Sequence, residues 1–214
     1  QTIDRYIQKN KQALVLVPEI GLTPQLFEQF HHRFGNVVSV LHSDITAKKR
    51  ADIWLKAKEN ILKIIIGTRS GVFTPFKDLG IIIVDEEHDS SLKQQNGLRY
   101  SARDLAILRA KYNKIPAVLG SATPSFETLM NVKNGKYKKI TLKNRVFSTP
   151  LPKINIIDLR VHPQKNGLTD TLVKAIRKHI KNGYQVLLFL NRRGFSPATV
   201  CVECGHIEEC PRCD

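Results

Sequence analysis

Three carboxylates and a histidine follow a run of four branched apolar residues. The run is Ile81-Ile82-Ile83-Val84, and Asp85, Glu86, Glu87 and His88 come directly after it. Such runs are typical of buried parallel strands, and open parallel sheets bind their ligands at the carboxyl ends of the strands. There, a first carboxylate can hold Mg²⁺ beside a nucleoside triphosphate, and the next can polarise the attacking water. The alternative interpretation is a solvated acidic turn.

A small, hydroxyl-bearing turn follows a second apolar run. Gly120-Ser121-Ala122-Thr123 comes after Ala117-Val118-Leu119. Such a turn can approach phosphates or the acidic cluster closely, and Ser121 and Thr123 can relay hydrogen bonds. Taken alone, the same turn could be an ordinary helix cap.

Three further turns could bind anions. Gly67-Thr68-Arg69-Ser70 offers backbone N–H groups, two hydroxyls and a guanidinium, which suit a DNA phosphate. The segment from Pro18 to Gln25 brings backbone donors and a helix N-terminus. Arg192 and Arg193 follow an apolar run and could reach a phosphate of ATP or DNA. Each turn could equally be a plain surface turn.

All the cysteines lie near the end of the sequence. Cys201, Cys204, Cys210 and Cys213 form two Cys-x-x-Cys pairs. This is the spacing of tetrahedral zinc sites, and it does not resemble a disulfide framework spread through a secreted domain. One ion held by all four thiolates is the simplest interpretation.

Composition restricts the class of protein. The chain has 214 residues, 42% of them hydrophobic and 25% charged, which is the balance of a folded α/β protein. The net charge of +15 favours a polyanionic partner such as nucleic acid, although a basic solubilising surface would give the same charge. No apolar run approaches the length of a membrane span, and the N-terminus has no signal pattern, so we expect a soluble intracellular protein.

The order of the segments predicts βα units around a parallel sheet. Strands are expected at 13–17, 37–41, 64–66, 81–84, 117–119, 154–157 and 186–190, and helices at 2–11, 23–34, 46–59, 101–112, 125–134 and 169–181. The segment 143–153, which holds Pro150 and Pro152, is the predicted linker between two domains. The stretch after His88 is too polar for a core, and we expect a surface loop there.

These motifs together resemble a known family. Asp85 to His88 and Ser121 to Thr123 are similar to motifs II and III of superfamily 2 helicases. Residues 16–25, 67–70 and 188–194 resemble motifs Ia, Ib and IV of the PriA-type (primosomal protein N′) replication-restart helicases, and residues 85–95 and 99–104 resemble that family's motif II and the loop after it. The resemblance covers nearly the whole chain and suggests an internal fragment of such a helicase.

The resemblance implies an architecture. Residues 1–143 would form a RecA-like parallel sheet domain without its first strand and phosphate-binding loop, and residues 144–153 a linker. Residues 154–200 would begin a second RecA-like domain, and residues 201–214 a zinc-binding insertion. In the family, eight cysteines bind two zinc ions as interleaved pairs, so Cys201 and Cys204 would serve one ion and Cys210 and Cys213 the other.

The resemblance also implies site residues, cofactors and partners. The catalytic set would be Asp85, Glu86, Glu87, His88, Ser121 and Thr123, with Asp85, Glu86, Arg192 and Arg193 contacting ATP and Mg²⁺. DNA would be bound by Pro18, Glu19, Gly21, Thr23, Gln25, Gly67, Thr68, Arg69, Ser70, Lys93 and Tyr100. The implied partners are forked DNA, single-strand-binding protein and primosome proteins. The implied localisation is the bacterial cytoplasm, with the protein associated with the nucleoid at replication forks and not with a membrane.

One expected motif is absent from the sequence. No Gly-x-x-x-x-Gly-Lys-Ser/Thr loop occurs in it, so the cradle for a triphosphate is missing. We therefore expect this chain alone to be inactive as an ATP hydrolase. The alternatives are a non-catalytic DNA- or zinc-binding module and another superfamily 2 DNA translocase.

Overall fold

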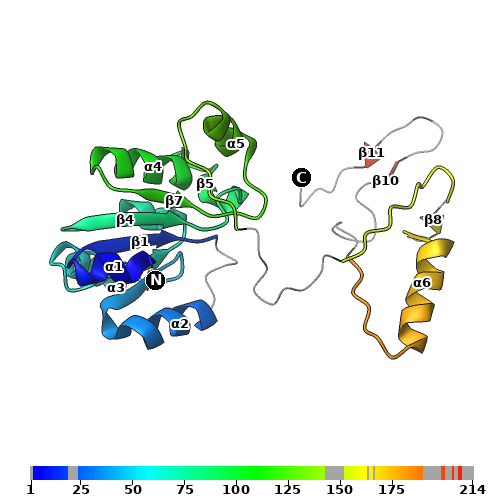
Figure 1. Cartoon of the computed structure of the whole chain (residues 1–214), viewed down its shortest axis with the longest axis horizontal. Helices are drawn as coiled ribbons and strands as arrows, with labels where there is room; N and C mark the ends of the chain where they lie inside the picture. Colours follow the sequence, from blue (N-terminus) through cyan, green and yellow to red (C-terminus); the bar gives the residue numbers. More distant parts are fainter. Residues whose placement is uncertain are drawn as a thin grey trace. The chain divides into compact units, whose positions relative to one another are not determined.

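The computed structural model describes residues 2–18, 24–142, 152–162, 164–165, 167–189, 199–200, 204 and 207–208 (Figure 1). The chain divides into two compact units, Gln1–Thr141 and Leu142–Asp214, which we describe separately.

The first unit is built on a five-stranded sheet in the order β2-β3-β1-β4-β7 (Figure 1). Every pairing in it is parallel. The strands are β1 (Gln12–Leu16), β2 (Val38–Leu41), β3 (Ile64–Gly67), β4 (Leu79–Val84) and β7 (Ala117–Leu119). This confirms the predicted parallel α/β sheet. All five strands end at the same edge, here called the carboxyl edge.

Helices precede, connect and follow these strands. They are α1 (Thr2–Gln8), α2 (Pro24–Phe34), α3 (Ala47–Lys58), α4 (Ala102–Tyr112) and α5 (Phe126–Lys133), with 3₁₀ turns η2 (Gly35–Val37), η3 (Arg69–Phe73) and η4 (Ser90–Leu92). Side-chain oxygens of Thr46, Ser101 and Ser125 cap α3, α4 and α5 by accepting backbone N–H groups. The predicted starts at 46, 101 and 125 therefore correspond to N-caps.

Side chains alternate between two apolar layers. Leu14, Ile65 and Ile82 share a register and face the layer formed with α3 and α4. The next residues along each strand face the opposite layer with Ile3 of α1 and, more peripherally, the phenylalanines of α2. Burial on both faces explains why these strands are continuous apolar runs in the sequence.

A buried amide fixes the amino end of the sheet. Gln12 is fully buried, and its Nε2 donates to the carbonyl oxygens of Ala57 and Leu62, both at 2.7 Å. Its Oε1 accepts the backbone N–H of Asp78 at 2.8 Å. One side chain thus ties the end of α3 to the starts of β3 and β4.

A short hairpin follows the acidic cluster, where we expected only a polar loop. Strands β5 (Lys93–Gln94) and β6 (Tyr100–Ser101) pair antiparallel. Leu92, just before them, is only 1% exposed and belongs to the core of the α3 and α4 layer. The expectation that this stretch is too polar for a core is therefore wrong at Leu92.

The described residues of the second unit include one long helix, α6 (Asp170–Lys181), capped by Thr169. The strand pairs β8 (Gln164–Lys165) with β9 (Leu168–Thr169) and β10 (Thr199–Val200) with β11 (Ile207–Glu208) are two residues long. The predicted strands at 154–157 and 186–190 are wrong for their described residues, because residues 152–158 and 184–189 have no regular structure.

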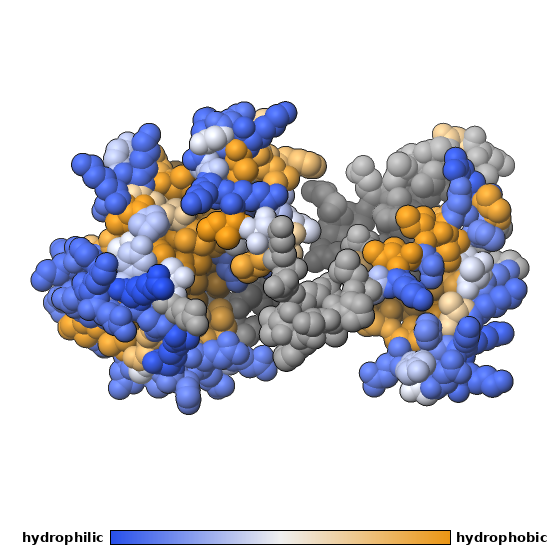
Figure 2. Space-filling view, viewed as in Figure 1, coloured by the Kyte–Doolittle hydropathy of each residue, from blue (hydrophilic) through white to orange (hydrophobic). Residues whose placement is uncertain are grey.

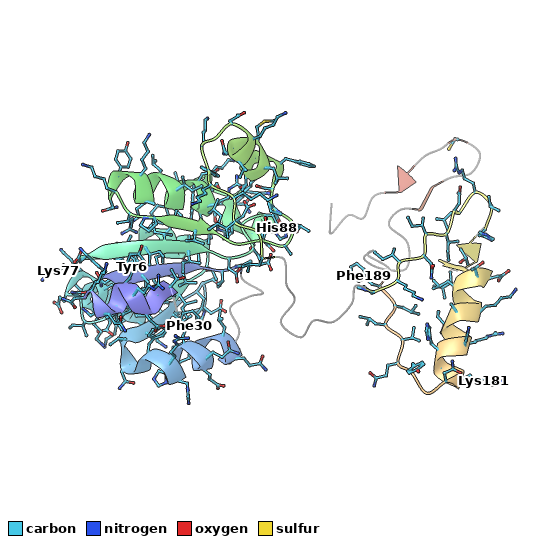
Figure 3. The ribbon with its side chains drawn as sticks, in the orientation of Figure 1. Tyr6, Phe30, Lys77, His88, Lys181 and Phe189 are labelled. Atoms are coloured by element: carbon cyan, nitrogen blue, oxygen red, sulfur yellow. The ribbon has the colours of Figure 1, made fainter. Side chains whose placement is uncertain are left out.

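Among the described residues, neither segment has a neighbouring strand, and its apolar side chains are exposed. Ile156 and Leu187 are each 94% exposed. Figure 2 shows hydrophobic surface on the described part of the second unit. Phe189, labelled in Figure 3, is also exposed. A strand needs a neighbouring strand to satisfy its backbone groups, and the described residues give these two segments none.

Candidate functional site

A hollow of about 430 Å³ lies at the carboxyl edge of the first unit. Turns after β1, β4 and β7 contribute to it together with the first turn of α2. Its lining residues are Val17, Pro18, Leu26, Asp85, Glu86, His88, Asp89, Ala122 and Thr123. The structure therefore brings together five residues predicted from three separate motifs: Pro18, Asp85, Glu86, His88 and Thr123.

Asp85 is exposed at the end of β4, between the ends of two neighbouring strands. Its backbone N–H donates to the carbonyl oxygen of Leu16 at 2.8 Å, which continues the β1–β4 ladder. A Cβ on Gly120 would lie 3.3 Å from Asp85 Oδ1. Glycine at position 120 thus keeps the space beside this carboxylate open.

Glu86 and His88 share the exposed turn after Asp85. Glu86 has φ of +45°, in the left-handed region that non-glycine residues seldom adopt and that clusters at functional sites. His88 is labelled in Figure 3. Its Nδ1 lies 2.8 Å from Ser121 Oγ and 3.5 Å from Glu86 Oε2, and its Nε2 lies 3.4 Å from Thr123 Oγ1. The histidine therefore bridges the acidic turn and the hydroxyl-bearing turn.

Glu87 lies outside the pocket lining, although it belongs to the same acidic run. It is 3% exposed. Its Oε1 accepts the backbone N–H of Ser125 at 2.7 Å, and its Oε2 accepts from Arg103 Nη1 (3.0 Å), Ser125 Oγ (3.0 Å) and Thr128 Oγ1 (2.9 Å). The side chain thus faces α4 and α5.

These hydrogen bonds decide the ionisation of Glu87. Burial alone would raise the pKa of this carboxyl, because it disfavours the charged form. The donors from Ser125, Thr128 and Arg103 outweigh burial and hold the pKa below its ordinary value. Burial likewise lowers the pKa of the Arg103 guanidinium, but Asp104 and Glu87 outweigh it and leave that pKa raised. The two groups form a buried ion pair.

The turn after β3 is tied to its neighbours. Thr68 is buried, and the Cβ of any residue at Gly67 would lie 3.1 Å from the Gly71 Cα. Arg69 Nη1 donates to the carbonyl oxygens of Ser91 (3.0 Å) and Lys93 (3.2 Å). Ser70 Oγ accepts from Arg50 Nη1 at 3.3 Å. This turn lies outside the pocket lining and is bound to the hairpin instead.

The hairpin residues predicted to bind DNA differ in accessibility. Lys93 is exposed and lies 3.9 Å from Glu127 Oε1. Tyr100 is half-buried and packs edge-on against Phe73, with ring centroids 5.0 Å apart. Leu92, which directly precedes the hairpin, is buried and therefore not accessible to DNA.

Several predicted residues lie outside the described parts of the chain. They are Glu19, Gly21, Thr23, Arg192, Arg193, Cys201, Cys210 and Cys213. Gln25 is described and is exposed in the first turn of α2. Cys204 is described as exposed with a free thiol.

Two further findings concern metals and membranes. Within the described residues, no group of three or more His, Cys, Asp or Glu side chains is arranged to hold a metal ion. The helices that the structure describes include none long and apolar enough to span a bilayer.

Sequence reasoning missed the partners of Glu87. The sequence places Arg103 only within the segment 99–104 that resembles the family, and it predicts Ser125 only as a helix start. The available signal is charge placement, since Arg103 lies near a predicted helix start in a segment that resembles the loop following the acidic cluster. That signal does not indicate which carboxylate Arg103 pairs with.

Comparison with known proteins identifies the family. The sequence profile described as DEAD/DEAH box helicase matches residues 1–132, which is more than half of the chain. The chain belongs to the DEAD/DEAH box helicase family. The acidic turn, the hydroxyl-bearing turn after β7 and the pocket between them all lie within the part that matches this helicase profile.

This DEAD/DEAH box helicase chain is also similar to replication restart proteins. It is 49% identical to replication restart protein PriA of Haemophilus influenzae, over 100% of this chain and 29% of that protein. It is 41% identical to PriA of Bacillus subtilis, over 100% and 27%, and 44% identical to PriA of Rickettsia felis, over 97% and 32%. The chain thus spans less than a third of these relatives.

Solved structures add little. The Pyrococcus furiosus Hef helicase domain aligns with 60% of this chain and 26% of its own length, at 10% identity and a TM-score of 0.40.

Proposed function

We propose that this chain is part of an ATP-dependent 3′-to-5′ DNA helicase that restarts stalled replication forks by primosome assembly. The observation that carries the proposal is the meeting of Asp85, Glu86, His88 and Thr123 around one pocket at the carboxyl edge of a parallel sheet. This is where open α/β folds bind their ligands. The similarity to PriA proteins supports the restart role.

The residues present fit a magnesium ion. Mg²⁺ usually keeps several waters and uses one or two carboxylates together with substrate phosphates, so it does not require a cluster of three side chains. Asp85 offers an exposed carboxylate with open space on the Gly120 side. When bound, the ion would neutralise phosphate charge. Asp85 would hold it.

Glu86 would orient and polarise the attacking water. Glu86 lines the same hollow as Asp85, and its backbone has a left-handed φ of +45°. Movements of this turn would be transmitted through His88 to Ser121 and Thr123 by the hydrogen bonds described above. Arg192 and Arg193 remain proposed contacts to the nucleotide.

DNA would be bound along the turns beside this pocket. Arg69 uses one guanidinium nitrogen on the hairpin, and a guanidinium carries five donors, so a phosphate could be bound as well. Lys93 adds an exposed charge nearby. The remaining proposed contacts are Pro18, Glu19, Gly21, Thr23, Gln25, Gly67, Thr68, Ser70 and Tyr100. The net charge of +15 suits such a ligand.

The architecture is proposed to be that of a RecA-like motor. Residues 1–143 would form most of its first domain, 144–153 a linker, 154–200 the beginning of its second domain and 201–214 a zinc insertion. Zinc is supported by the Cys-x-x-Cys spacing of Cys201 with Cys204 and of Cys210 with Cys213. Single-strand-binding protein and primosome proteins at bacterial forks are the proposed partners.

An ATPase comparison tests this proposal. DNA-stimulated ATP hydrolysis is measured for this chain and for the full-length protein that contains it. The sequence lacks a phosphate-binding loop, so we expect turnover in the full-length protein alone. No turnover in either would favour a non-catalytic DNA- or zinc-binding module. Turnover driven by duplex DNA without forks or single strands would favour another superfamily 2 translocase.

A further inference from the structure

A single residue holds both ends of the loop that carries Ser121 and Thr123. The backbone N–H of Glu87 donates to the carbonyl oxygen of Gly120 at 3.0 Å, before the loop begins. The carboxylate of the same residue accepts the backbone N–H of Ser125 at 2.7 Å, where the loop ends and α5 starts. Residues 121–124 therefore lie between two attachments to Glu87.

Arg103 completes this arrangement. Its Nη1 donates to Glu87 Oε2 at 3.0 Å and to Ser125 Oγ at 2.7 Å, and its side chain is only 7% exposed. It lies in the first turn of α4, directly after β6 of the hairpin. The buried Glu87–Arg103 ion pair therefore connects the end of the 121–124 loop to the helix that follows the hairpin.

We infer that Glu87 is a positioning residue, which with Arg103 holds the 121–124 loop so that Ser121 and Thr123 meet His88. Its carboxylate faces away from the pocket, so it does not touch the reacting atoms. The inference rests on the proposed ATP-driven function. It replaces the catalytic role expected for Glu87 by a role that acts through the loop.

The donor pattern shows why the carboxylate is required. Ser125 N–H on Oε1 and Arg103 on Oε2 are fixed donors, which cannot turn into acceptors. A glutamine has one oxygen and one NH₂ group, so either orientation directs its NH₂ at a fixed donor. The side-chain hydroxyls of Thr128 and Ser125 are different, because they can rotate and accept a hydrogen bond from the glutamine NH₂.

Removing Arg103 as well should therefore repair the glutamine variant. In E87Q/R103M, the glutamine oxygen can accept Ser125 N–H while its NH₂ donates to the two hydroxyls. The methionine preserves much of the arginine stem's packing. A residue whose charge acted directly on the reaction would gain nothing from this second change.

The test uses the full-length protein with four variants: E87Q, E87Q/R103M, T128V and the control E59Q, which makes the same chemical change at an exposed site at the end of α3. Hydrogen exchange of the Ser125 amide reports the loop, and kcat and KM for ATP with saturating DNA report the reaction. For E87Q we expect exchange at least about ten-fold faster and kcat about ten-fold lower, with KM nearly unchanged. In E87Q/R103M and in T128V, both the Ser125 exchange rate and kcat should lie within about three-fold of wild type. In E59Q, both should equal the wild-type values.

Each contrary result has one meaning. Unchanged Ser125 exchange in E87Q would overturn the clamp. Restored exchange with kcat still low in E87Q/R103M would show that the Glu87 charge acts in the reaction, which would overturn the positioning role. A wild-type protein without DNA-stimulated hydrolysis would overturn the proposed function, even where exchange follows the predicted order.

Discussion

The contact between His88 and Ser121 makes a quantitative prediction. We consider His88→Ala, Ser121→Ala and the double variant in the full-length protein. The single changes should each lower the DNA-stimulated kcat for ATP, because each breaks the bridge between the acidic turn and the loop after β7. The double variant should be less impaired than the product of the two single effects.

The size of this coupling follows from the geometry. The Nδ1–Oγ distance is 2.8 Å, within the normal range, and the His88 side chain is 37% exposed. A hydrogen bond of this kind contributes about 1 kcal/mol, which corresponds to roughly a five-fold effect on a rate. The contacts of His88 with Glu86 and Thr123, and of Ser121 with the Thr123 N–H, add to the single effects but cancel in the cycle.

The assay is steady-state ATP hydrolysis at saturating single-stranded DNA, with DNA binding measured in parallel so that loss of binding is not mistaken for loss of coupling. Single effects that multiply to the double effect within about two-fold would refute the bridge, because sites without an interaction are additive to about 0.3–0.5 kcal/mol. A double variant worse than the product would also refute it.

Three other predictions concern stability, pH and metal. Gln12→Leu should lower the free energy of unfolding of this chain by about 3 kcal/mol in urea titrations, because it removes the three hydrogen bonds of the buried Gln12 amide to the Asp78 N–H and to the Ala57 and Leu62 carbonyls; a loss below about 1 kcal/mol would contradict that account. Because the folded pKa of Glu87 lies below the ordinary 4.5, its stabilisation is present above that pH and is lost as the pH falls through the folded pKa, so E87Q should show a weaker acid destabilisation than wild type; parallel curves would contradict this. Cys204→Ser in the full-length protein should lower bound zinc by about one ion per chain in elemental analysis, and unchanged zinc would exclude Cys204 as a ligand.

Sequence predicted the first unit well for a physical reason. Strands such as β3 and β4 are buried on both faces, so they appear as uninterrupted β-branched runs ended by polar turns. Helix starts at Thr46, Ser101 and Ser125 follow from local capping chemistry, which a sequence displays directly. Asp85 directly follows the β4 run, so its position at the carboxyl edge could be predicted as well.

Features that depend on distant partners could not be predicted. Three consecutive carboxylates do not show which one faces the pocket, and the partners of Glu87 lie 16, 38 and 41 positions away. The apolar runs at 154–157 and 186–190 look like strands, but strand formation needs neighbours that the described residues do not supply. Leu92 is core within a polar stretch because the hairpin folds it onto α4.

The most direct test of the account is Glu86→Gln in the full-length protein, compared with Glu59→Gln as the control. If Glu86 polarises the attacking water, DNA-stimulated kcat should fall by at least about 100-fold, while binding to forked DNA stays within about two-fold of wild type. Glu59→Gln should leave both unchanged. Turnover retained by Glu86→Gln would contradict the assignment of this pocket as the site of ATP hydrolysis.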